Sequence, residues 1–296
     1  MQLIIKNLSK TYSNGVQALK DINLTINSGM FGLLGPNGAG KSSLMRTIST
    51  LQEPDSGTIT LGDIDVLHQK DEVRKTLGYL PQEFGVYPKI SAEDLLDHLA
   101  VLKGITNRSQ RKELVTSLLH KTNLFNDKKK HLSGYSGGMK QRFGIAQALL
   151  SNPKLIIVDE PTAGLDPAER NRFLNLLGEL SDETIVILST HIVEDVKELC
   201  TDMAIINKGQ VLMQGNPLKA LDDLKGKIWS QRVDRELAAD YKERLNVISD
   251  KLVAGKPTLH VLSDTKPEAG FEQTIPDLED VYFSYIFGSQ PQALTV

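Results

Sequence analysis

The chain has 296 residues, of which 40% are hydrophobic and 24% charged, and its formal net charge is −3. These values are typical of a folded globular protein with one large or two unequal domains, and they argue against extensive disorder. The nearly balanced charge argues against a nucleic-acid-binding protein, which usually carries a basic excess. The single cysteine, Cys200, excludes an internal disulfide and fits a reducing cytosol.

Apolar runs along the chain are short. The run near the N-terminus is interrupted at Lys6 and is too short for the apolar core of a signal peptide. No stretch of about 18 apolar residues occurs, so we expect that any membrane span used by this protein belongs to another chain.

The first fifty residues predict strands, then a loop and a helix. Apolar and polar residues alternate over 19–26, which is typical of a half-buried strand. The apolar run 30–34 predicts a buried strand that ends at a glycine, and Leu44, Met45 and Ile48 then recur at helical spacing. The order is therefore strand, glycine-rich loop and helix.

The middle of the chain is predicted to be helical. Short strands are expected at 58–61 and 76–80, and helices then begin near Ser91, Arg108 and Ser136. Ser91 followed by Asp94 resembles a helix N-cap box.

Alternating strands and helices return after residue 151. The apolar runs 155–158 and 184–188 are separated by a predicted helix at 168–180, a pattern that indicates a parallel sheet covered on both faces. The runs 203–206 and 210–213 then predict a hairpin-like pair.

We place a domain boundary after residue 216, where Gly215-Asn216-Pro217 interrupts the pattern. This gives a first domain at 1–216, with a helical part at about 85–152, and a C-terminal extension at 217–296. In the extension we expect a helix at 236–248 and a strand at 259–262.

The segment Gly35-Pro-Asn37-Gly38-Ala-Gly40-Lys41-Ser42 matches the phosphate-binding pattern G-x-x-x-x-G-K-[ST]. Glycines let backbone N–H groups approach phosphate oxygens, and the following helix points its positive end at the same anion. Lys41 is expected at the outer phosphates and the Ser42 hydroxyl at Mg²⁺. A chance glycine-rich turn is the alternative, but the position between a strand and a helix favours a nucleotide site.

The run Leu155-Ile-Ile-Val-Asp159-Glu160 is an apolar strand that ends in two acids. Strand ends of an open α/β sheet face the ligand crevice. Asp159 suits the Mg²⁺ shell, and Glu160 is then placed to act as general base on the attacking water. A strand followed by a solvated turn is the alternative.

The segment Ser136-Gly-Gly138-Met-Lys-Gln-Arg142 resembles the signature motif of the nucleotide-binding subunits of ATP-binding-cassette (ABC) transporters. Ser136 and two glycines that open a helix make a second anion-binding helix N-terminus. In that family this end binds the γ-phosphate of ATP held by the opposite subunit. A plain helix cap is the alternative, and the partial copy Leu132-Ser133-Gly134 is the competing register.

Further residues match the same family in order. The resemblance implies that Tyr12 stacks on adenine, that Gln82 contacts Mg²⁺ and water, and that His191 contacts the γ-phosphate. It also implies that the loop 163–166 crosses a dimer interface. The residues expected at the nucleotide are Tyr12, Gly35, Asn37, Gly38, Gly40, Lys41, Ser42, Ser43, Ser136 and Gly138. Glu160, His191 and Gln82 are the expected catalytic residues, and Ser42, Gln82 and Asp159 the expected Mg²⁺ ligands.

The resemblance covers residues 1 to about 216 and implies an ATPase. The implied fold class is α/β, a phosphate-loop NTPase with a mostly parallel sheet, an antiparallel β subdomain, a helical subdomain and a small C-terminal α+β extension. The implied cofactors are ATP and Mg²⁺. The implied partners are a second nucleotide-binding subunit, most simply in a homodimer, and a transmembrane permease at the cytoplasmic face of the membrane. No nucleic-acid partner is expected.

The segments Phe31-Gly-Leu-Leu, Gly85-Val-Tyr-Pro, Tyr135-Ser-Gly-Gly and Leu278-Glu-Asp-Val-Tyr resemble the branch of drug-resistance and ABC-2-type exporters. Tyr135 replaces the leucine that often precedes the signature serine, and this replacement also occurs in that branch. A soluble ABC protein that acts on ribosomes or DNA remains the alternative function. For the aromatic run 281–287, packing within the extension and a partner contact are both open.

Overall fold

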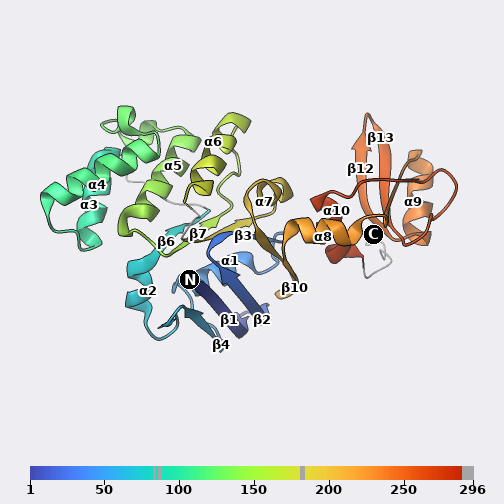
Figure 1. Cartoon of the computed structure of the whole chain (residues 1–296), viewed down its shortest axis with the longest axis horizontal. Helices are drawn as coiled ribbons and strands as arrows, with labels where there is room; N and C mark the ends of the chain where they lie inside the picture. The colour runs from blue at the N-terminus through green and yellow to red at the C-terminus, as the bar shows by residue number, and fades with distance from the viewer. Residues whose placement is uncertain (83–84, 86–88, 181–183, 289–296) are drawn as a thin grey trace.

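The computed structural model describes residues 1–82, 85, 89–180 and 184–288. Three sheets and several helices form an elongated molecule (Figure 1). The helices α3 and α4 lie at one end, the C-terminal strands β12 and β13 lie at the other, and the central sheet lies between them. The segment Gly85-Val-Tyr-Pro falls largely outside the described residues.

The central sheet has six strands in the order β10-β9-β3-β8-β7-β6. They are β3 (Gly29–Leu34), β6 (Leu77–Leu80), β7 (Leu155–Asp159), β8 (Ile185–Thr190), β9 (Asp202–Asn207) and β10 (Gln210–Gly215). Neighbouring strands pair in parallel, except that β10 runs antiparallel to β9. Every residue of β7 and β8 is buried, which explains their continuous apolar sequences. The α/β class and the mostly parallel sheet are therefore confirmed.

The antiparallel N-terminal sheet contains β1 (Gln2–Thr11), β2 (Gln17–Asn27), β4 (Ser56–Leu61) and β5 (Ile64–Asp65). Buried and exposed residues alternate along β2, as its sequence predicts. The helix α1 (Lys41–Ile48) packs its apolar residues in one core with this sheet and the central sheet. That packing fixes the start of α1 relative to both sheets.

The helical part contains α3 (Ala92–Leu102), α4 (Arg108–Lys121) and α5 (Gly137–Ala148), which share a separate apolar core. The side chain of Ser91 caps α3 by accepting a hydrogen bond from the backbone N–H of Asp94 at 3.1 Å, which confirms the predicted start of this helix. The short helix α2 (Lys70–Thr76), which was not predicted from the sequence, precedes β6. Two further helices, α6 (Pro167–Gly178) and α7 (Val193–Leu199), pack with β7 and β8.

The C-terminal extension contains β11 (Ile228–Arg232), β12 (Val247–Val253), β13 (Lys256–Leu262) and β14 (Glu272–Gln273) in one sheet, with α9 (Arg235–Arg244) against it. The predicted helix 236–248 is wrong at its end, because the chain becomes extended at Leu245 and Val247 begins β12. Buried Val247 packs with Leu259 and Val261 of β13, and this sheet packing outweighs local helix propensity.

Two other helices of the extension, α8 (Pro217–Leu224) and α10 (Leu278–Phe287), pack on the apolar core that contains β7, β8, α6 and α7. The helix α10 also contacts β12 of the C-terminal sheet. Leu278, Val281 and Tyr282 of α10 are buried in the same cluster as Val196 of α7. Tyr285 and Phe287 are 43% and 39% exposed. The aromatic run therefore contributes to packing on one face and remains accessible on the other.

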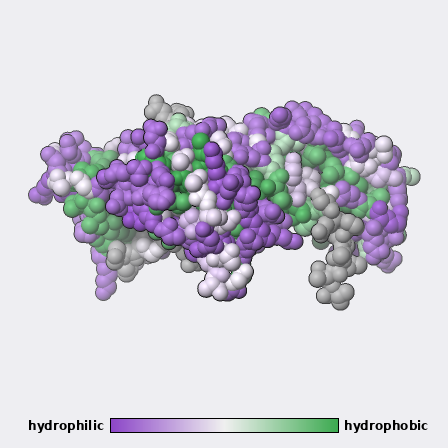
Figure 2. Space-filling model, turned by 90° about the horizontal axis from the view of Figure 1, so that it is seen from below, coloured by the Kyte–Doolittle hydropathy of each residue, from purple (hydrophilic) through white to green (hydrophobic). Residues whose placement is uncertain are grey.

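Hydrophilic side chains dominate the face seen in Figure 2, with apolar side chains interspersed among them. Within the described ranges, no helix is both long enough and apolar enough to cross a bilayer.

Leu278→Ala should destabilise the protein by about 2–5 kcal/mol, because Leu278 is 1% exposed between α10 and the core. Urea unfolding followed by circular dichroism measures the change. Ile275→Ala is the matched control, since Ile275 is 88% exposed and its truncation should change the free energy of unfolding by less than about 0.5 kcal/mol. Equal effects of the two substitutions would contradict the packing of α10 on the core.

Candidate active site

The phosphate loop and the three predicted catalytic residues follow the carboxyl ends of four adjacent strands of the central sheet. The loop 35–40 follows β3, His191 follows β8, Glu160 follows β7, and Gln82 lies two residues beyond β6. The strands are in register at these ends, where Leu34 pairs with Thr190 and Asp159 pairs with Ser189. A ligand at this edge can therefore contact residues from all four segments.

The loop 35–40 needs glycine for two different reasons. Gly40 precedes α1 with a φ of 109°, and a Cβ there would lie 2.5 Å from the backbone oxygen of Ala18. A Cβ on Gly35 would collide with the backbone oxygen of Ile206. Because Gly40 provides no side-chain cap, the first N–H groups of α1 are left for another acceptor, as an anion site at a helix N-terminus requires.

Lys41 is buried at the start of α1, with 5% of its side chain exposed. Its ammonium donates hydrogen bonds to the backbone oxygens of Gly35 at 2.6 Å and Pro36 at 3.3 Å. Burial lowers the pKa of Lys41, although the nearby carboxylates of Glu160 and Asp159 oppose this shift. The side chain is thus curled over the loop, next to the place where phosphates would lie.

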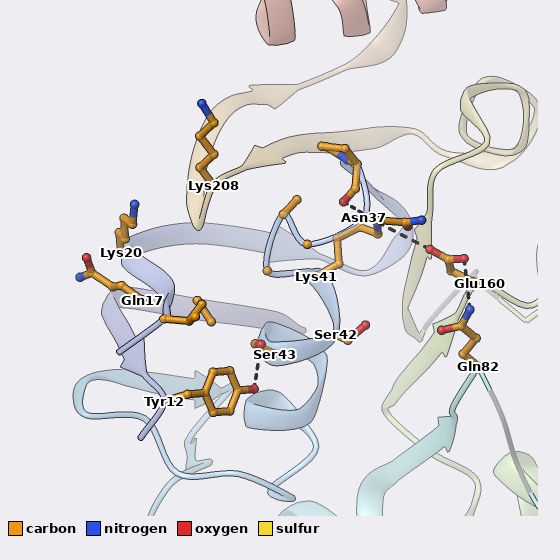
Figure 3. A pocket seen from close by; sticks show the side chains of 16 residues that line it. Tyr12, Gln17, Lys20, Asn37, Lys41, Ser42, Ser43, Gln82, Glu160 and Lys208 are labelled. Carbon is orange, nitrogen blue, oxygen red and sulfur yellow. Dashed lines mark hydrogen bonds and ion pairs between the residues drawn. The ribbon is translucent and has the colours of Figure 1, made fainter. Parts of the chain in front are cut away.

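Glu160 connects the four segments. One carboxylate oxygen lies 3.6 Å from Lys41 Nζ, and the other lies 3.5 Å from Gln82 Nε2 (Figure 3). That second oxygen also lies 3.1 Å from His191 Nδ1. The backbone of Glu160 has a φ of 48°, a strained conformation for a non-glycine residue. Its N–H donates to the backbone oxygen of Ser189 at 2.8 Å. This strained backbone conformation accompanies the direction of the Glu160 carboxylate, which points toward Lys41 and the loop 35–40.

Asp159 is 4% exposed, and in the part of the chain that the structure describes its buried Oδ1 has no hydrogen-bond partner. A buried carboxylate oxygen without a partner is costly, so a cation there would be favourable. Among those same residues, no three His, Cys, Asp or Glu side chains could hold a metal by themselves. A single buried carboxylate such as Asp159 fits Mg²⁺, which protein sites commonly bind through one or two carboxylates together with phosphates and water.

A cavity of about 790 Å³ opens beside the loop. It is lined by nine of the predicted site residues, namely Tyr12, Asn37, Gly38, Gly40, Lys41, Ser42, Ser43, Gln82 and Glu160. Figure 3 shows Ser42 directed toward the side that carries Gln82 and Glu160, and Tyr12 on the opposite side. The cavity therefore has two distinct ends.

Three polar lining residues were not expected from the sequence, namely Gln17, Lys20 and Lys208. Lys208 lies in the turn between β9 and β10, where Gly209 N–H donates to the Ala39 backbone oxygen at 2.9 Å and Lys20 N–H donates to the Gly209 oxygen at 2.8 Å. The Lys208-Gly209 turn signal was visible in the sequence, but its position beside the loop depends on tertiary hydrogen bonds.

Tyr12 is held beside α1 by its hydroxyl. The hydroxyl donates to Gln52 Oε1 at 2.8 Å and lies 2.9 Å from Ser43 Oγ. These contacts fix the ring at the cavity wall, which is compatible with stacking on a base. They also engage Ser43, which was expected at the phosphates.

Ser136 and Gly138 do not line this cavity. Ser136 is the N-cap of α5, and its hydroxyl accepts from Met139 N–H at 3.2 Å. Ser133, in the competing register, lies within a short 3₁₀ turn at Leu132–Gly134. A Cβ on Gly138 would collide with the Glu169 carboxylate, which is ion-paired with Arg142.

Comparison with known proteins places these observations in one family. Residues 19–163 match the family described as ABC transporter. The chain is 32% identical over 299 residues to the uncharacterized ABC transporter ATP-binding protein YxlF of Bacillus subtilis (strain 168), covering 96% of this chain and 99% of that protein. It is 31% identical to the probable multidrug ABC transporter ATP-binding protein YbhF of Escherichia coli (strain K12), covering 92% of this chain but only 50% of YbhF.

Among solved structures, a dimeric ATP-binding cassette in a post-hydrolysis state, bound to ADP and Pi, is similar with a TM-score of 0.66 and 27% identity. That similarity covers 72% of this chain and 98% of the cassette. Together with the loop, the paired acids and the cavity, these similarities show that the chain belongs to the ABC transporter family, as an ATP-binding and ATP-hydrolysing subunit.

Proposed function

We propose that this chain is one of two nucleotide-binding subunits that power export through a separate membrane permease. The observation that carries its catalytic part, ATP hydrolysis, is the position of Glu160, which contacts Lys41, His191 and Gln82 at the rim of the cavity. In a site of this kind the triphosphate lies on the loop 35–40 and the N-terminus of α1, and the adenine lies against Tyr12.

Within this proposal Glu160 is the general base. It accepts a proton from the water that attacks the γ-phosphorus, while Gln82 orients that water. Lys41 moves from the backbone oxygens of the loop to the outer phosphates, where its charge opposes the developing negative charge. His191 contacts the γ-phosphate from the other side of Glu160.

Asp159, Ser42 and Gln82 are the residues proposed to hold Mg²⁺. The unpartnered Oδ1 of Asp159 supports this assignment within the described residues. When bound, the ion would neutralise charge on the β- and γ-phosphates.

Ser136 and Gly138 are proposed to complete the site of a second subunit. The N-terminus of α5 presents N–H groups, but it does not line the cavity of its own chain. A dimer would give it an anion to bind, since each α5 would then face the triphosphate held by the opposite loop. The dimeric cassette among the similar structures supports this arrangement.

The membrane partner and the direction of transport rest on similarity. The exporter-like segments and the likeness to YbhF support export through a permease, with this chain peripheral at the cytoplasmic face. We further propose residues 1–216 as the ATPase domain, with its helical part at about 85–152, and residues 217–296 as an accessory or dimerisation extension.

Lys41→Ala should weaken ATP binding by about 10- to 100-fold, because a charge-assisted contact to the outer phosphates contributes about 1.5–3 kcal/mol. Isothermal titration calorimetry with ATP measures the dissociation constant. Lys75→Ala is the control, since Lys75 is 68% exposed and paired with Glu72 at the surface. An unchanged affinity in Lys41→Ala would remove Lys41 from the phosphate site.

Glu160→Gln should lower kcat for ATP hydrolysis by about 10²- to 10⁴-fold, the usual effect of losing a general base. ATP binding should persist, so the variant should form ATP-dependent dimers that gel filtration and light scattering detect. Glu179→Gln, at an exposed position after α6, is the control. Normal hydrolysis by Glu160→Gln would show that the base is another group.

A further inference from the structure

Asp195 is a fully buried carboxylate outside the cavity. It lies in the first turn of α7 with 0% of its surface exposed, and it does not line the cavity. A buried charge of this kind is costly unless polar groups surround it. The groups that compensate Asp195 come from three segments, and two of these segments carry Glu160 and His191.

One carboxylate oxygen of Asp195 binds two threonines. The hydroxyl of Thr162 donates to it at 2.6 Å, and the hydroxyl of Thr190 lies 3.4 Å away. Thr162 follows Glu160 by two residues, and Thr190 directly precedes His191. Both threonines are buried, at 3% and 1% exposure, so these hydrogen bonds are shielded from water.

The other carboxylate oxygen accepts a hydrogen bond from Arg170 Nε at 2.7 Å. Arg170 lies in the first turn of α6, which begins directly after the loop 163–166. Asp195 thus joins the segment after Glu160, the segment before His191 and the helix after that loop.

The neighbouring backbone needs such support. Glu160 has a φ of 48°, and strained residues persist only where the surroundings hold them. On one side Glu160 is held by its N–H bond to Ser189, and on the other the chain is held by the contact of Thr162 with Asp195. The residues on either side of His191 are also joined, since Ile192 N–H donates a hydrogen bond to the Thr190 hydroxyl at 2.9 Å.

We propose that Asp195 is a positioning residue for ATP hydrolysis, which holds Glu160 and His191 in register through Thr162 and Thr190. The proposal rests on the proposed roles of Glu160 and His191. It assigns to Asp195 no contact with nucleotide, so its loss lowers turnover without weakening ATP binding.

The test measures kcat, KM and ATP affinity for Asp195→Asn, Thr162→Val and the double variant of the full chain. Asp195→Asn should lower kcat at least about tenfold, since small displacements of reacting groups cost up to about 10²-fold, with KM within about twofold. Thr162→Val should lower kcat in the same way. The kcat of the double variant should be no lower than that of Asp195→Asn, because both substitutions disrupt the same contact between Thr162 and Asp195.

Asp280→Asn is the matched control for the loss of a buried carboxylate. Asp280 is also 0% exposed, and it pairs with His260 Nδ1 at 2.6 Å in the C-terminal extension. This variant should lower the melting temperature while leaving kcat within about twofold of wild type, when both are assayed well below their transitions. The comparison separates general destabilisation from an effect on turnover.

A kcat within about twofold of wild type for both Asp195→Asn and Thr162→Val would overturn the positioning role, as would an equal loss in Asp280→Asn. If Asp195→Asn or Thr162→Val fails to fold, the kcat of the other variant still tests the positioning role. Glu160→Gln assayed in parallel tests the proposed function separately. Normal turnover by Glu160→Gln would reject that function, whereas an inactive Glu160→Gln beside a fully active Asp195→Asn would reject only the positioning role.

Discussion

The ion pair between Lys41 and Glu160 is the interaction on which the site depends. Both side chains are largely buried, and Asp159 is buried next to them. The three groups carry one positive and two negative charges when ionised, so the outer phosphates meet excess negative charge beside Glu160, whereas Lys20 and Lys208 add positive charge elsewhere in the cavity lining. Burial strengthens that repulsion because the effective dielectric constant is lower there. At this end of the cavity, phosphate binding is therefore favoured by the N–H groups at the start of α1 and by a cation that accompanies the phosphates.

This requirement explains the architecture around the loop. The sheet brings Lys41, in the helix that follows β3, and Glu160, which follows β7, to one edge, although β8 lies between these strands. Glu160 reaches across that strand because its backbone adopts a φ of 48° and its N–H is fixed to Ser189 of β8. With extended backbone at Glu160, its carboxylate would point along β7 and away from the loop 35–40.

Much of this could be predicted from the sequence, because the phosphate loop and the acidic strand end are local patterns. Continuous burial of β7 and β8 also produced an unambiguous apolar signal. The sequence could not show that Lys208 lines the cavity or that Asp195 binds Thr162, since these contacts join residues 33 or more positions apart. The end of α9 was mispredicted for a related reason, because Val247 becomes a strand residue only when β13 is present to pack against it.

The helix α7 links the site to the end of the chain. On one side its buried Asp195 supports the segments that carry Glu160 and His191, and on another its buried Val196 shares a core with Leu278 and Val281 of α10. A seven-residue helix has little stability of its own and depends on tertiary packing for its position. The extension therefore contributes part of the packing that holds α7 in place. Through α7, the extension and the core beneath the catalytic segments are packed together even though they are far apart in sequence.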